Sequence, residues 1–233
     1  MAYQPDLDRL LTAGSRYADD TFGYLIEPHR LTDAVLPTGQ IVGCDPLVSA
    51  ADATPFTVTV PPGTYPVWAW VAVLRDPEVD TDLDHRRVAA LQLVVVDEPA
   101  ARWELALGPG QDTTVLKGDE FFGYGVDAGM GTLADVVALR AMSTWDQDRV
   151  EEVYIIDLPW APVPGVIVAV TDEATGANVV STMSGWGDGA YPTFIGYTAD
   201  GRVASFVTDF LVAPAPASEL HCGLPRQGDP TAP

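Results

Sequence analysis

The residues of this chain with the clearest chemical potential are four aspartates beside glycines or at expected strand ends. They are Asp127, Asp135, Asp188 and Asp209. Carboxylate oxygens are the ligands that hard divalent cations prefer, and two carboxylates can act as a general acid and base. Convergence of Asp127, Asp188 and Asp209 would therefore give a divalent-cation site or a metal-assisted hydrolase. The alternative for each is structural, because aspartate also bonds backbone amides at turns and helix starts.

Asp188 lies in an unusual segment, Ser184–Pro192, whose sequence is SGWGDGAYP. Glycine reaches positive φ and allows close backbone approach, so this segment is predicted to be a loop that presents Asp188 or neighbouring amides. Trp186 and Tyr191 are either packing anchors or the walls of a ligand pocket. The candidate ligand-binding residues are therefore Asp127, Trp186, Asp188, Tyr191 and Asp209.

Acidic residues also alternate through residues 76–84, DPEVDTDLD, with a spacing like that of a calcium loop. The glycine and glutamate that an EF-hand requires are missing, so a solvated connection is favoured over a weak cation site. The histidines lack metal-site spacing, and no serine lies in a nucleophile elbow. These histidines are His29, His85 and His221. The sequence leaves the question of enzymatic activity open.

The 233 residues include 12 Lys and Arg against 33 Asp and Glu, a formal net charge of −21. This charge repels phosphate backbones, so we expect no direct nucleic-acid binding; it is compatible with a basic protein partner, nucleic-acid mimicry or solubility alone. No apolar run approaches the ~18 residues of a membrane span, and the N-terminus lacks a signal-peptide pattern. We therefore predict a cytoplasmic protein with no membrane contact. Cys44 and Cys222 are expected to be free thiols.

Periodicity predicts a mainly β protein. Apolar spacing indicates a short docking helix in residues 5–11, with Gly14 placed to stop it, and a second helix over residues 133–142. Strands are expected at residues 22–26, 40–44, 56–60, 65–74, 88–96, 102–107, 121–126, 153–156, 166–170, 179–183, 193–197 and 203–208. Many short strands between Gly/Pro turns favour an antiparallel β-sandwich or partly open barrel with one or two short helices. Residues 1–212 are predicted to form one domain, and residues 213–233 an irregular or disordered tail.

Several segments together resemble a bacterial domain-of-unknown-function family, the one numbered 4241. They are Cys44–Leu47, Val126–Gly129, Ser184–Pro192, Gly196–Gly201 and Thr208–Phe210. The resemblance covers residues 36–210, so the N-terminal helix and the tail lie outside it. Because the family is functionally uncharacterised, the resemblance implies no catalytic residue. It implies only that Asp127, Trp186, Asp188 and Asp209 belong to the recurring signature.

Functions from different classes remain. The first is a soluble acidic bacterial binding or interaction protein without catalysis, favoured by the charge of −21 and by the lack of a recognised nucleophile or histidine base. The alternative is a divalent-metal-binding module or metal-assisted hydrolase built on Asp127, Asp188 and Asp209. A third is a non-catalytic sandwich with a ligand pocket at Trp186 and Tyr191. The cofactor is unknown, and a divalent cation is the one candidate.

Overall fold

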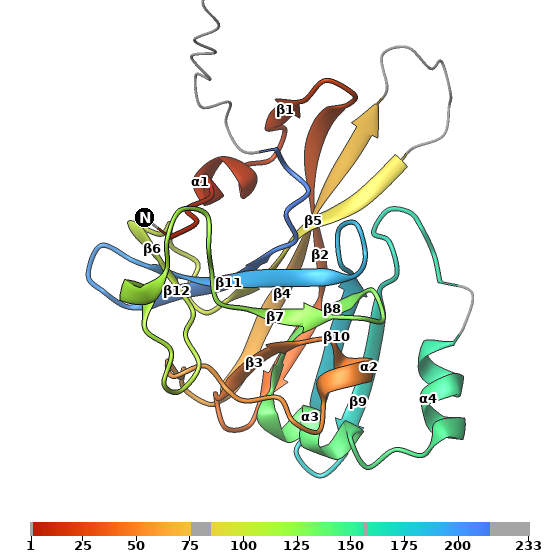
Figure 1. The fold of residues 1–233 in the computed structure, drawn as a ribbon. Coiled ribbons are helices and arrows are strands. Elements are labelled where there is room, and N and C mark those ends of the chain that lie inside the picture. The colour runs from red at the N-terminus through yellow and green to blue at the C-terminus, as the bar shows by residue number, and fades with distance from the viewer. Residues whose placement is uncertain (1, 76–84, 156–157, 215–233) are drawn as a thin grey trace, which may run out of the picture.

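The larger of two antiparallel sheets curls into a half-barrel in the computed structural model, which describes residues 2–75, 85–155 and 158–214 (Figure 1). Its strands run in the order β1-β2-β4-β5-β12-β11-β6, and β7 pairs with β11. The bounds are β1 Arg16–Ala18, β2 Gly23–Leu36, β4 Gly63–Arg75, β5 His85–Val94, β12 Val203–Asp209, β11 Gly189–Tyr197, β6 Arg102–Leu105 and β7 Gly123–Val126.

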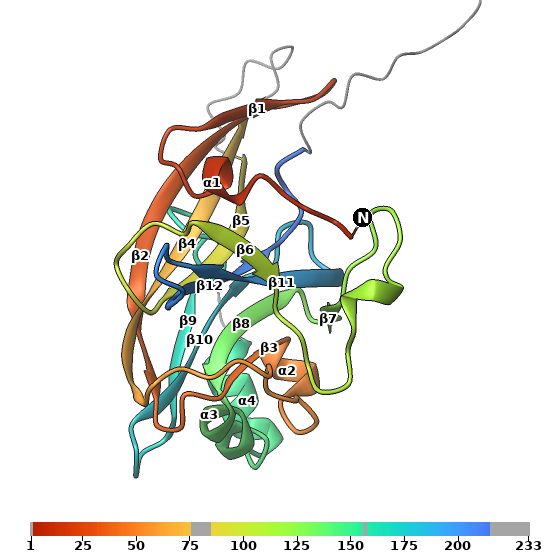
Figure 2. The ribbon, with the colours of Figure 1, turned by 90° about the vertical axis from the view of Figure 1, so that its left-hand side faces the viewer.

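A four-stranded sheet, β3-β8-β10-β9, packs against the larger one. Its strands are β3 Ile41–Cys44, β8 Met130–Asp135, β10 Ala177–Met183 and β9 Ile167–Asp172. The Asn178 amide joins the sheets, because it accepts a hydrogen bond from the Val35 N–H at 2.8 Å and donates one to the Asp33 carbonyl at 2.9 Å. Figure 2 shows the lower half of β2 beside β9 and β10.

The core lies between the sheets and is built on the two longest pairings, β2 with β4 and β4 with β5. Val67, Ala69 and Val71 alternate along β4 and are fully buried, as is Leu91 in β5. β-Branched and apolar residues at this two-residue period fit a pleated surface with a buried face. Burial of their apolar area, at roughly 25 cal/mol per Å², is the main term that favours this arrangement.

Short helices lie at both ends of the molecule (Figure 1). α1 and β1 lie at one end, while α2, α3 and α4 lie at the other, where α3 packs against β9 and β10. An aspartate caps the start of each α-helix with its carboxylate. The helices are α1 Leu7–Leu10, α2 Pro46–Ser49, α3 Val136–Met142 and α4 Gln147–Tyr154, with a 3₁₀ turn at Thr113–Val115.

The mainly β prediction is confirmed, and so is the antiparallel pairing of the two long central strands. Turns predicted around Gly176 and Gly201 join β9 to β10 and β11 to β12. The N-terminal helix is present, with Leu7 and Leu10 buried and Gly14 at positive φ. The structure contains more short helices than the one or two expected.

Two strand predictions are wrong. Residues 56–60 form no strand, because their backbone bonds go to two separate segments: the Phe56 N–H reaches Ile41, and the Thr57 N–H reaches Leu107. Residues 153–154 belong to α4, which the sequence reading missed and which Asp146 caps. Residues 76–84, 156–157, His221, Cys222 and the tail from residue 215 lie outside the described residues. The predicted domain boundary at residue 212 therefore stays a prediction.

The second predicted helix starts three residues later than expected. Leu133 and Ala134 pair with β3 instead, and the helix begins at Val136 because the Asp135 carboxylate caps it, accepting from the Val137 N–H at 2.9 Å. The same buried carboxylate accepts the N–H groups of Thr38 and Gly39, each at 3.0 Å. Asp135 therefore serves the fold by joining α3 to the turn before β3.

We predict that Asp135→Ala lowers the free energy of unfolding by on the order of 3 kcal/mol, because it leaves several buried N–H donors without an acceptor. Urea unfolding of the whole chain measures this loss. The matched control is Asp146→Ala, which removes an exposed cap and should cost about 1 kcal/mol. Equal losses in the two variants would show that the additional bonds of Asp135 contribute nothing.

Candidate functional site

Asp127 and Asp188 adjoin the last pair of the β7–β11 ladder, Val126 with Gly189, but the described residues do not gather all the predicted aspartates into one cluster. Asp127 and Asp188 are exposed, whereas Asp209 is buried and Asp135 is occupied as a helix cap. Within the described parts of the chain, no group of three or more His, Cys, Asp or Glu side chains is arranged to hold a metal ion. The Asp188 carboxylate accepts no hydrogen bond from any described residue, so its side chain does not fold back on its own backbone.

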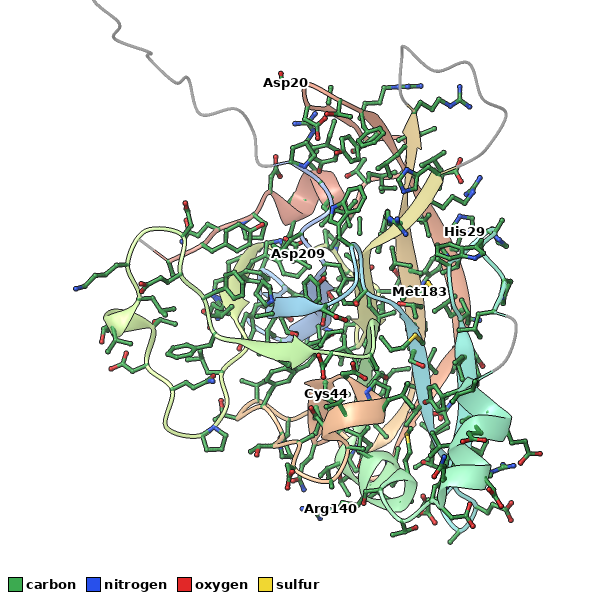
Figure 3. The ribbon with its side chains drawn as sticks, turned by 45° about the vertical axis from the view of Figure 1, so that its right-hand side comes forward. Asp20, His29, Cys44, Arg140, Met183 and Asp209 are labelled. Atoms are coloured by element: carbon green, nitrogen blue, oxygen red, sulfur yellow. The ribbon has the colours of Figure 1, made fainter. Side chains whose placement is uncertain are left out.

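Asp209 holds the N-terminal segment on the larger sheet. Its carboxylate, at the end of β12, accepts from the Tyr3 hydroxyl at 3.0 Å and from the Leu211 N–H at 2.8 Å. Burial raises the pKa of Asp209 to about 6, although both hydrogen bonds oppose the rise. The Tyr3 ring also contacts the rings of Phe121 and Phe194. Figure 3 shows Asp209 beneath the N-terminal helix, in a different region from Cys44.

A buried carboxylate that the site prediction omitted, Asp45, joins two of the signature segments. It caps α2 through the Leu47 N–H at 3.0 Å. It also accepts the N–H groups of Asp127 and Ala128, at 3.1 and 2.7 Å. The signal was readable locally, because an aspartate followed by proline after a strand is a common helix start. The preceding Cys44 is a buried free thiol whose pKa is raised by burial.

The glycine-rich segment forms a turn that hydrogen bonds hold in place. The turn is shorter than the predicted loop because β11 begins at Gly189. The Ser184 N–H donates to the Gly129 carbonyl at 3.0 Å, and the Ser184 hydroxyl donates to the Gly187 carbonyl at 2.9 Å. The Tyr191 hydroxyl reaches the same Gly187 carbonyl at 2.7 Å. Tyr191 is therefore a packing anchor that fixes the turn.

Gly185 shows why this turn needs glycine. Its φ is +45°, and a Cβ there would lie 2.5 Å from the Phe210 carbonyl oxygen. Only glycine allows the turn to approach the backbone after β12 so closely. Trp186, next in the chain, is consequently held at the surface with half of its side chain exposed.

These segments enclose a pocket of about 310 Å³, which we call the Arg87 pocket. One signature segment contributes Leu47, a second Ala128 and Gly129, and a third the residues 184–187. The remaining lining residues are Arg87, Met130, Tyr154, Leu158, Trp160 and Met183. The Asp45 carboxylate accepts hydrogen bonds from the first two segments, and the Ser184 N–H donates to the second, so signature residues that are distant in sequence form three connected walls.

Arg87 is the cation of this pocket. Its guanidinium lies 5.1 Å from the ring centroid of Trp186 and 5.9 Å from that of Trp160, and both tryptophans are at least half exposed. Across the described residues it forms no ion pair, and its buried Nε has no hydrogen-bond partner. His85 contacts Trp186 edge to face, and burial together with Arg87 lowers the pKa of His85. His85 is therefore mainly neutral at pH 7.

Of the predicted ligand-binding residues, only Trp186 lines the pocket. Asp127 and Asp188 are neighbours of lining residues in the chain, Tyr191 supports the turn, and Asp209 lies under the N-terminal segment. Sequence reasoning missed Arg87 and Trp160. Neither carries a local signal, because their meeting with Trp186 depends on the tertiary fold.

Comparison with known proteins gave one family model, described as "Protein of unknown function (DUF4241)", which matches residues 34–208. The match includes all three pocket segments but begins after Tyr3 and α1 and ends one residue before Asp209. No curated protein and no solved structure matched the chain. Among the described residues, no helix is long and apolar enough to cross a membrane.

We predict that the ionisation of Asp209 opposes folding. Burial raises the pKa of Asp209 to about 6, above the ordinary aspartate pKa of about 4. The stability associated with the protonated carboxyl is therefore complete below the ordinary pKa and is lost as pH rises through the raised pKa of the folded state. Between about pH 4 and pH 7 this loss should be on the order of 3 kcal/mol. Asp209→Asn should remove that part of the pH dependence, as measured by urea unfolding at both pH values.

The control for this prediction is Asp146→Asn, at an exposed helix cap, which should retain the parent pH dependence. A parent and an Asp209→Asn variant whose stabilities change in parallel with pH would show that Asp209 titrates normally.

Proposed function

This chain belongs to the DUF4241 family of proteins of unknown function, and on that premise we propose that it is a non-catalytic binding protein. We assign recognition to the Arg87 pocket and infer that the ligand is a small organic anion with an apolar body. One observation carries this proposal: three signature segments converge on a pocket in which Arg87, the one cation among the described lining residues, lies 5.1 and 5.9 Å from the ring centroids of two exposed tryptophans.

The charge of the pocket supports an anion. Arginine is always protonated, and its planar fork suits carboxylate and phosphate oxygens. An unpaired buried donor such as the Arg87 Nε also costs free energy, which an acceptor on a ligand would recover. The chain as a whole carries a net charge of −21 and therefore repels anions. A cation without an ion pair in the described residues distinguishes this pocket as a place that favours an anionic ligand.

The walls of the pocket support an apolar body for the ligand. Met130, Met183 and Leu158 supply aliphatic surface, and the two tryptophans supply aromatic faces. Methionine adapts to varied shapes, while tryptophan and arginine are enriched where binding energy concentrates. Among the described residues, the lining contains no carboxylate or imidazole base, which is why we assign it binding and no reaction.

The net charge supports a second part of the proposal, that a basic protein is the physiological partner. Charge complementarity accelerates encounter and sets salt dependence, and the same charge disfavours nucleic acid as a ligand. We place the protein in the bacterial cytoplasm, in keeping with its content of only two cysteines.

The pocket is tested by titrating the whole protein with benzoate, indole-3-acetate, phenyl phosphate and inorganic phosphate while recording tryptophan fluorescence and melting temperature. We expect at least one aromatic anion to bind more tightly than inorganic phosphate. Arg87→Met should weaken that binding at least ~10-fold, since charge-assisted hydrogen bonds contribute about 1.5–3 kcal/mol. Arg140→Met, on the exposed face of α3, is the charge-matched control and should bind like the parent.

The proposal would fail if no probe bound at millimolar concentration, or if Arg87→Met and Arg140→Met bound equally well. Trp186→Phe separates the aromatic contact from the charge, because it keeps a ring in the pocket. It should weaken the aromatic anions more than inorganic phosphate.

The partner is tested by affinity capture at low and at physiological ionic strength, with an unrelated protein of similar charge as control bait. We expect a basic protein that this chain retains and the control bait does not, released as salt screens the charges. Capture that is identical with both baits would show non-specific charge attraction.

A further inference from the structure

A second hollow lies across the strands of the larger sheet. A groove of about 540 Å³ crosses β2, β4, β5 and β12, and we call it the Trp68 groove. Its lining residues are Pro28, Arg30, Pro66, Trp68, Trp70, Gln92, Val94, Val96, Asp97, Glu98, Ala204 and Ser205. None of them belongs to the Arg87 pocket. We propose that this groove binds an uncharged oligosaccharide through stacking on Trp68, the half-buried tryptophan of its lining.

Strand register builds the platform. Trp68 and Trp70 are two residues apart in β4, so both side chains lie on the same face of the sheet. Trp70 is buried and supports the groove from below, whereas Trp68 is half-buried and offers the accessible ring. They pair across to Arg30 and Pro28 of β2, and Trp68 pairs with Gln92 of β5 on the other side. Neighbouring strands lie about 5 Å apart, so these residues form a continuous surface about three strands wide. Figure 2 shows β2, β4 and β5 side by side.

The polar groups of the groove suit hydroxyl ligands. The Gln92 Oε1 accepts from the Trp70 indole at 2.9 Å, which fixes the amide plane. The amide nitrogen of Gln92 then remains without a partner among the described residues, as does the Ser205 hydroxyl beside it. An amide donor and a hydroxyl next to aromatic faces can bond the edge of a sugar ring whose apolar face stacks on indole.

The charges of the groove are mostly neutralised within the chain, which argues for an uncharged occupant. Arg30 is paired with Asp33 at 2.5 Å. Glu98 receives two hydrogen bonds from the Arg202 guanidinium, at 2.8 and 2.9 Å. Of the charged lining residues only Asp97 lacks an ion pair within the described chain, and a carboxylate is a good acceptor for sugar hydroxyls. The Arg87 pocket, in contrast, presents a cation that forms no ion pair within the described chain.

The test uses the full chain with cellohexaose, maltohexaose and chitohexaose, followed by calorimetry and by tryptophan fluorescence. We expect one of these hexasaccharides to bind. Trp68→Ala should weaken it at least ~10-fold, which is the loss expected when one stacked aromatic side chain is removed. Gln92→Glu keeps the acceptor for Trp70 but removes the amide donors, so it should also weaken binding. Trp160→Ala, in the Arg87 pocket, should leave the affinity unchanged.

Several outcomes would overturn the proposal. One such outcome is that none of the three sugars binds at millimolar concentration. Another is that the parent and Trp68→Ala bind the sugar with equal affinity. The melting temperatures of Trp68→Ala and Gln92→Glu are measured beside that of the parent to show that both variants are folded. Loss of sugar binding in Trp160→Ala would move the site elsewhere. Proline-rich peptides also dock on aromatic grooves, so a peptide of residues 213–220 is titrated in parallel. Binding of that peptide without any sugar would assign the groove to a peptide.

Discussion

One buried carboxylate, that of Asp45, supports the arrangement around the Arg87 pocket. A fully buried charge is tolerated only when hydrogen bonds replace its water, and Asp45 obtains three from backbone N–H groups. Those groups belong to two segments more than 80 positions apart, the start of α2 and the turn after β7. The requirement to satisfy one anion thus fixes the relative position of two pocket walls.

The third wall is attached to the second by backbone contact. Ser184 bonds Gly129, and Gly185 approaches Phe210 too closely for any side chain. This geometry fixes the backbone from which Trp186 projects, because Ser184, Gly185 and Tyr191 all hold the turn. A preorganised backbone loses little conformational entropy on binding, which favours recognition at such a position.

The sequence was most informative where the physics is local. Alternation of apolar residues located the long strands β4 and β5, and Asp-Gly and Thr-Gly turns located two hairpins, because side-chain period and positive φ are properties of neighbouring residues. The helix after β8 was placed too early because its apolar pattern continues a buried strand, and only the bonds of Asp135 to distant residues reveal the boundary.

The candidate site was less accessible for the same reason. Trp186 could be predicted as a candidate because glycines flank it in the sequence. Arg87 has no such neighbours, and only the tryptophan rings that the fold brings near it mark it as a candidate. The partner of Asp209 is more than 200 positions away, at the N-terminus. A lone aspartate could therefore be singled out in the sequence without its role being readable there.

The bridge made by Asn178 also protects the protein against association. β1 covers only the first residues of β2, so the remainder of β2 would present free peptide groups as a sheet edge. A carboxamide has one acceptor and donors in the same plane, as a peptide group does, and Asn178 engages the Val35 N–H and the Asp33 carbonyl together. A single side chain thus occupies the place that a foreign strand would need to begin pairing, and the longest strand of the molecule is closed to edge-to-edge aggregation at that point.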